Sequence, residues 1–77
     1  MMPQTELKNK IRKYRADKGI DQAGLAEKVH VTRQTIQAIE TENYVPSITL
    51  ALKIARFFET DVQKIFDIKR LEDGETS

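Results

Sequence analysis

Three side chains that can each form paired hydrogen bonds occur within five residues of sequence, at Arg33, Gln34 and Gln37. A guanidinium group and two amides can bond in bidentate fashion to base edges, which the major groove of DNA presents. At 100° per residue, Gln34 and Gln37 point to one side of a helix, and Ile36 and Ile39 point to the other. The pattern fits a base-reading face and an ordinary solvated helix face about equally well.

The elements that must hold this face begin at two N-terminal caps. Asp21 is a good cap for a short helix, and Thr32 caps a second helix that runs to about Thr41. The first helix has one stripe of apolar positions, at Leu25, Ala26 and Val29. The segment 21–44 is therefore predicted to form two short helices joined by a tight turn.

This segment closely resembles the lambda-repressor and Cro-like helix-turn-helix family, in its short single-domain members. The resemblance runs from about residue 7 to residue 66, and its matching positions are Gln22, Leu25-Ala26, Val31-Thr32, Ile36, Ile39-Glu40 and Pro46-Ser47. The chain has His30 and Glu42 at two positions where the family often has Gly. His accepts a left-handed conformation better than most residues, so the turn at His30 is strained but allowed.

The resemblance implies an all-α domain of five helices, with a short β-ribbon from the chain termini as an option. It also implies that the second motif helix enters the major groove of double-stranded DNA, where Arg33 would read guanine and Gln34 and Gln37 would read adenine. Side chains at helix ends and in the next loop would hold phosphates, and these are Gln22, Thr32, Thr35, Thr41, Asn43 and Tyr44. No cofactor and no small-molecule ligand are expected.

Arg15 and Glu40 are expected to form a structural ion pair. In the family, the matching arginine pairs with the acid at the position of Glu40. An unpaired buried charge is costly, so one partner implies the other. We therefore expect a structural role for both residues, rather than a DNA contact for Arg15 or a catalytic role for Glu40.

The flanking segments are predicted from apolar spacing. Leu7, Ile11 and Tyr14 repeat at i, i+4 and i+7, which indicates a helix that ends at Lys18-Gly19. Its cap is either Thr5 or Asn9, and with Asn9 as the cap the residues 6–8 would be extended.

Two further helices follow the motif. Ser47 caps the segment SITLALKIARFF, whose one clear polar stripe is Thr49, Lys53 and Arg56, so this helix is predicted to be the centre of the core. Asp61 caps a short last helix with Val62, Ile65 and Phe66 at i, i+3 and i+4. Ile68 and Leu71 no longer fit that stripe, so they are expected to form a short strand or a surface for a partner.

Length and composition narrow the class of protein. Seventy-seven residues make one small domain, which we expect at 7–71, between a loose arm at 1–6 and a disordered acidic tail at 72–77. The chain has no Cys, and its single His cannot build a zinc site or a plausible catalytic triad alone. We therefore expect neither a metal nor an enzyme. The chain also has no signal peptide and no membrane span, which indicates a cytoplasmic location.

Charge is distributed unevenly along the chain, although the net charge is only +1. Residues 1–18 hold six basic side chains against two acids, and residues 59–77 hold six acids against three bases.

The family resemblance leads us to expect a DNA-binding regulator, a repressor that binds a palindromic operator as a homodimer through Phe66, Ile68 and Leu71. The near-neutral charge leaves open a protein-interaction module, such as an antitoxin or adaptor, with the same fold.

Overall fold

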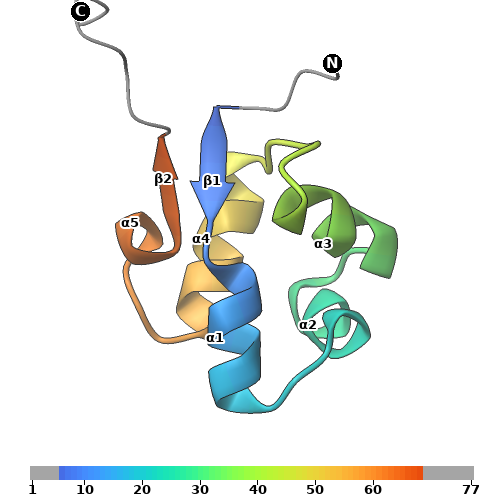
Figure 1. The fold of residues 1–77 in the computed structure, drawn as a ribbon. Helices are drawn as coiled ribbons and strands as arrows, with labels where there is room; N and C mark the ends of the chain where they lie inside the picture. Colours follow the sequence, from blue (N-terminus) through green and yellow to red (C-terminus); the bar gives the residue numbers. More distant parts are fainter. Residues whose placement is uncertain (1–5, 69–77) are drawn as a thin grey trace, which may run out of the picture.

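The computed structural model describes residues 6–68 as five helices and a two-stranded sheet (Figure 1). In chain order the elements are β1 (Leu7–Asn9), α1 (Ile11–Lys18), α2 (Gln22–Val29), α3 (Arg33–Glu40), α4 (Ile48–Phe57), α5 (Val62–Ile65) and β2 (Phe66–Ile68). This confirms the five-helix fold and the optional ribbon. Most of the arm expected at 1–6, all of the tail at 72–77, the candidate cap Thr5 and the dimer residue Leu71 lie outside the described residues.

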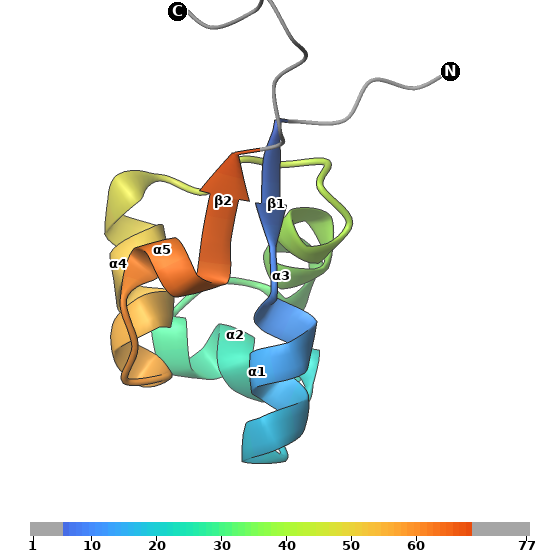
Figure 2. The ribbon, with the colours of Figure 1, turned by 60° about the vertical axis from the view of Figure 1, so that its left-hand side comes forward.

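The small sheet joins the two ends of the domain. β1 pairs antiparallel with β2, with Leu7 opposite Ile68, and the Asn9 side chain donates a 2.8 Å hydrogen bond to the carbonyl of Ile39. Figure 2 shows the two strands side by side, with α4 and α5 on one side and α3 on the other. Leu7 is therefore not the first residue of a helix, because α1 begins at Ile11. Its N-cap position is Lys10, which makes no side-chain cap hydrogen bond, and the Ile11 N–H donates a 3.1 Å hydrogen bond to Oδ1 of Asn9.

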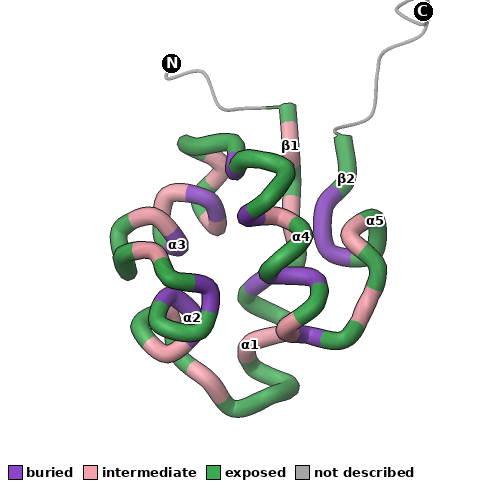
Figure 3. The backbone as a smooth tube through the Cα atoms, turned by 180° about the vertical axis from the view of Figure 1, so that it is seen from behind, coloured by how far each residue is buried: buried purple, intermediate pink, exposed green. Residues whose placement is uncertain are grey.

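The helices meet in a single apolar core. Its most deeply buried side chains are Ile11, Leu25, Ile36, Ile39, Ile54 and Ile65. Figure 3 shows buried positions recurring along α2, α3 and α4 between exposed ones, as amphipathic helices require. Among residues 6–68, no helix is long and apolar enough to cross a membrane.

Two expectations about the core need correction. α4 buries Leu50 and Ile54, but Ile48 is 79% exposed and Leu52 is 54% exposed. Positions two residues apart point to nearly opposite sides of a helix, so an apolar helix can still have one uncovered face. Phe66, expected in a dimer contact, lies in the monomer core instead, because the start of β2 turns its ring inward.

Side-chain caps fix the starts of α2, α3 and α4. The side chains of Asp21, Thr32 and Ser47 accept hydrogen bonds from the backbone N–H three residues later, at 2.7, 3.2 and 3.0 Å. The turn between α2 and α3 passes through His30 in the left-handed conformation, with φ 65° and ψ 46°. The strain expected at His30 is therefore present.

We predict that His30→Gly stabilises the protein. The left-handed conformation costs a residue with a side chain about 1–2 kcal/mol, and the greater chain entropy of Gly offsets part of that gain. The expected result is a melting temperature higher by roughly 2–8 °C, measured by circular dichroism. Lys28→Gly, inside α2, is the matched control and should lower the melting temperature. An unchanged or lower value for His30→Gly would contradict the assigned turn.

Candidate nucleic-acid interface

α3 carries the predicted reading face on the side away from the core. Ile36 and Ile39 are almost fully buried, and Arg33, Gln34 and Gln37 are exposed. α2 packs against α3, so the apolar side of α3 is held by the preceding helix. The arrangement presents one guanidinium and two amide side chains to solvent on a rigid helix, which suits recognition of base edges.

Glu40, at the last position of α3, forms an ion pair with Arg15, and its side chain is almost completely buried. Its side chain is 1% exposed. Arg15 of α1 donates to both carboxylate oxygens, from Nε to Oε2 at 2.6 Å and from Nη2 to Oε1 at 3.1 Å. The third nitrogen of Arg15 donates to the carbonyl of Ile20 at 3.2 Å. The structure thus brings the two expected partners together, and the pair ties α1 to α3.

The environment of Arg15 favours its charged form. The hydrogen bond to Glu40 raises the pKa of Arg15 above its ordinary value, burial works in the opposite direction, and the nearby negative charges of Glu40 and Asp21 add to the increase. A raised pKa on a base means that the stabilisation is present below the unfolded-state pKa and is lost only as the pH rises through the folded-state pKa. Arg15 therefore stays protonated near neutral pH, and the ion pair with Glu40 is kept.

Gln22 connects this ion pair to the reading face. Its amide nitrogen donates to Oε1 of Glu40 at 3.0 Å, and its amide oxygen accepts from Nη1 of Arg33 at 3.3 Å. The sequence predicted only a phosphate contact for Gln22, and no local pattern pairs it with a residue eighteen positions away. One N–H of the Gln22 amide remains for a phosphate, because a primary amide has two. Arg33 also retains several N–H donors for a base.

Four candidate phosphate ligands form hydrogen bonds with one another and with backbone. The hydroxyls of Thr32 and Thr35 lie 3.1 Å apart at the start of α3. The Thr41 hydroxyl donates to the carbonyl of Gln37 at 2.9 Å and accepts from the Asn43 amide at 3.0 Å. These contacts shape the two ends of α3, and all four side chains except the half-buried Thr35 remain exposed.

The loop after α3 places Tyr44 at the surface. The residue is 48% exposed, so the structure does not bury the ring of Tyr44 in the core. Glu42 has a positive φ of 66°, a backbone conformation that favours Gly. The loop therefore keeps a glycine-like backbone despite the carboxylate.

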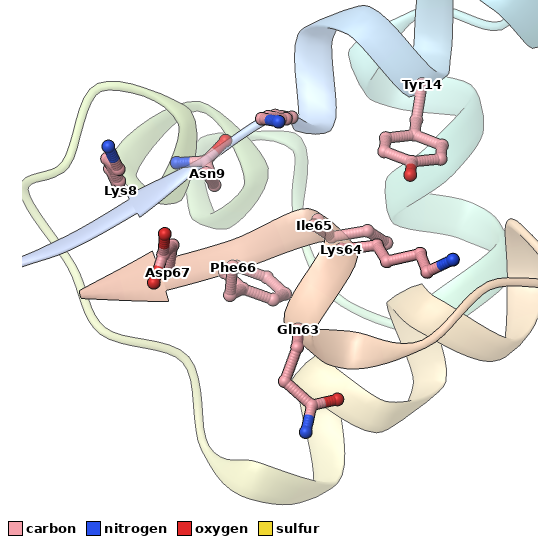
Figure 4. Close-up of a pocket in the computed structure, with 9 residues that line it drawn as sticks. Lys8, Asn9, Tyr14, Gln63, Lys64, Ile65, Phe66 and Asp67 are labelled. Atoms are coloured by element: carbon pink, nitrogen blue, oxygen red, sulfur yellow. The ribbon is translucent and has the colours of Figure 1, made fainter. Parts of the chain in front are cut away.

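A hollow lies between β1, β2, α1 and α5. It has a volume of about 430 Å³. Figure 4 shows that the side chains of Lys8, Gln63 and Lys64 point in different directions, away from one another. A specific ligand site needs polar groups that converge on the ligand. The hollow therefore does not provide a built binding site, and the strongest candidate site remains the face of α3.

Comparison with known proteins places the chain in a family. The helix-turn-helix family profile matches residues 11–65. The uncharacterized HTH-type transcriptional regulator MJ0272 of Methanocaldococcus jannaschii is 50% identical over 60 residues, which cover 78% of this chain and 91% of that protein. The uncharacterized HTH-type transcriptional regulator YgzD of Bacillus subtilis is 48% identical over 60 residues, with the same two coverages.

Solved structures agree with this assignment. A putative DNA-binding protein from Bacteroides fragilis has the same fold with a TM-score of 0.71 at 23% identity, over 79% of this chain and 98% of that one. The clp gene regulator ClgR from Corynebacterium glutamicum has a TM-score of 0.64 at 27% identity, over 68% of this chain and 55% of that one. The chain therefore belongs to the XRE-type helix-turn-helix family.

Proposed function

We propose that this protein is a sequence-specific DNA-binding transcriptional regulator that acts as a repressor. The observation that carries the proposal is the exposed polar face of α3, opposite the buried Ile36 and Ile39, within a helix-turn-helix motif. Similar proteins named as transcriptional regulators support the same function. A domain of this size that occupies its operator would act by excluding other proteins from the DNA.

In the proposed complex, α3 lies in the major groove with its N-terminal end toward the base edges. Arg33 reads guanine, and Gln34 and Gln37 read adenine. The contact between Gln22 and Arg33 holds the guanidinium at the start of α3. This contact limits the number of arginine conformers, so less entropy is lost when the base contact forms.

Phosphate contacts fix the position of α3 in the groove. The proposed ligands lie at the two ends of α3, at the start of α2 and in the following loop, and they are Gln22, Thr32, Thr35, Thr41, Asn43 and Tyr44. Two copies, related by a two-fold axis, read the two halves of a palindrome about one helical turn apart. Ile68, which is 62% exposed, is a proposed contact between the two copies.

A second candidate function is a protein-interaction module, such as an antitoxin or adaptor. The near-neutral net charge of +1 favours it, because DNA-binding domains are usually strongly basic. The same fold can serve either function, so the two must be separated by experiment.

The proposed function predicts that a random pool of double-stranded DNA yields one enriched palindrome. Binding to the selected site should weaken steeply with salt, by about 10³-fold or more between 50 and 200 mM if roughly six or more phosphates are contacted. Selection followed by titration at several salt concentrations measures both properties. Absence of an enriched sequence, together with no salt-dependent retention on bulk DNA, would instead support the interaction module.

A further inference from the structure

The side chain of Arg12, at the second position of α1, lies at the surface where α1, α2 and α3 approach one another. Its Nε lies 4.0 Å from Oε1 of Glu40, and its side chain is 78% exposed. This separation is too long for a hydrogen bond. Among residues 6–68, the Arg12 side chain has no hydrogen-bond partner and no other ion pair. Its donors are therefore available to a group outside the protein.

The buried carboxylate of Glu40 is satisfied without Arg12. Oε1 of Glu40 accepts from Nη2 of Arg15 at 3.1 Å and from Nε2 of Gln22 at 3.0 Å, and Oε2 accepts from Nε of Arg15 at 2.6 Å. A carboxylate oxygen has about two lone-pair sites, so both sites at Oε1 are occupied. An ion pair as exposed as that of Arg12 contributes little to stability. A structural role therefore does not account for Arg12.

The surface around Arg12 has an excess of positive charge. Arg15 is paired with the buried Glu40, and the carboxylate of Asp21 accepts a hydrogen bond at the start of α2. The side chains of Arg12 and Arg33 are exposed, and neither forms a close ion pair with an acid of the described part of the chain. Uncompensated positive charge of this kind attracts an anion.

We propose that Arg12 binds a phosphate of the DNA backbone, and that this is the phosphate contacted by Gln22. Nε of Arg12 and Nε2 of Gln22 both lie within 4.0 Å of one atom, Oε1 of Glu40, so a single phosphate in front of them can reach both donors. The Glu40 side chain is 1% exposed, so its paired charge lies behind these donors. The planar N–H groups of arginine match two phosphate oxygens. This contact rests on the proposed function and adds a ligand from α1, outside the motif.

Arg12 also lies between two sets of proposed phosphate ligands. Gln22 begins α2, and Thr41 and Asn43 follow Glu40 at the end of α3. Because Arg12 lies near both Gln22 and Glu40, a DNA strand held at both places passes close to Arg12. A free anion fits less well, since so exposed a guanidinium holds one only weakly, whereas DNA bound through α3 keeps its phosphate at a high local concentration.

The first test compares Arg12→Ala with Lys13→Ala in the full chain. Lys13 is exposed and lies two residues from the buried Ile11, on the opposite side of α1, so its removal is a matched loss of charge. The Kd values for the selected operator and for scrambled DNA are measured over a series of salt concentrations. Arg12→Ala should weaken binding to both DNAs roughly tenfold and reduce the slope of log Kd against log salt by about one. Lys13→Ala should weaken binding less than about threefold and leave the slope unchanged.

The second test replaces single phosphates of the operator by neutral methylphosphonates. At one phosphate of each half-site, the replacement should weaken binding of the wild type roughly tenfold. It should affect Arg12→Ala much less, because the contact is already absent, and the same loss of sensitivity should appear for Gln22→Ala. A variant Arg12→Ala that remains as sensitive as the wild type at every phosphate would overturn the assignment.

Melting temperatures separate a DNA contact from a structural role. Arg12→Ala should melt within about 4 °C of the wild type. A lower melting temperature with an unchanged salt slope would mean that Arg12 only supports Glu40. If the wild type selects an operator but Arg12→Ala binds like Lys13→Ala, the contact of Arg12 is refuted and the proposed function stands. If the wild type shows no salt-dependent binding to either DNA, the proposed function fails, and the contact fails with it.

Discussion

Glu40→Gln is expected to lower the free energy of unfolding by about 3–5 kcal/mol, because it leaves the guanidinium of Arg15 without its counter-ion. The substitution retains the shape of the side chain, but an amide can accept from Arg15 at only one atom, whereas the carboxylate accepts at two. The introduced NH₂ group would also face the donor groups of Arg15 or Gln22. For a domain of this size the loss approaches the total stability, which is roughly 5 kcal/mol or slightly more.

The measurement is thermal unfolding by circular dichroism, with an expected decrease in melting temperature of roughly 12–40 °C. Glu27→Gln is the matched control, since Glu27 is an exposed acid on α2, and a change within about 0.5 kcal/mol is expected there. Replacing Arg15 and Glu40 together by apolar residues of similar size should recover much of the loss, because no unpaired buried charge remains; Arg12, 4.0 Å from Glu40, is 78% exposed. If Glu40→Gln has the same melting temperature as the wild type, the ion pair does not contribute to stability in the way that its burial indicates.

Features that depend on neighbouring residues could be predicted from the sequence. A cap needs only a side-chain oxygen and the N–H group three residues later, so Asp21, Thr32 and Ser47 define the starts of three helices locally. The buried side of α3 follows from the spacing of Ile36 and Ile39 in the same way. These local signals, together with the family resemblance, locate the motif.

Features that depend on distant segments were only partly predictable. The ribbon forms because residues 7–9 pair with residues 66–68, which are far away in the sequence. Three-residue strands are too short to show a distinct periodicity of their own. The contacts of Gln22 with Glu40 and Arg33 arise from the crossing of α2 and α3. The exposure of Ile48 was missed because an apolar pattern shows which residues avoid water, not which face another element covers.

Arg33→Ala and Gln34→Ala are expected to weaken binding to the selected operator while changing binding to scrambled DNA much less. Each bidentate base contact contributes about 1–3 kcal/mol of discrimination, which corresponds to roughly a 5- to 150-fold change in Kd. Both residues are exposed on α3 and point away from its buried side, so truncation removes no core packing. The loss should therefore appear in recognition rather than in stability.

Tyr44→Phe tests positioning alone, and Gln22→Ala tests positioning and base reading together. Tyr44→Phe removes a hydroxyl from the loop after α3, and a lost phosphate contact should weaken binding to both DNAs by similar factors. Gln22→Ala should weaken both DNAs and also reduce discrimination, because it additionally removes the acceptor that holds Arg33. It should lower the melting temperature as well, since one donor to the buried Glu40 is lost.

The decisive measurement is a pair of titrations for each variant, with operator and scrambled DNA at one fixed salt concentration, because both affinities depend on salt. The Kd for scrambled DNA divided by the Kd for the operator measures base reading. For Arg33→Ala and Gln34→Ala this ratio should fall by the factor that the base contact contributes, and for Tyr44→Phe it should stay constant. Equal losses on both DNAs for Arg33 and Gln34 would mean that α3 does not read sequence, and the interaction module would then become the better account of this surface.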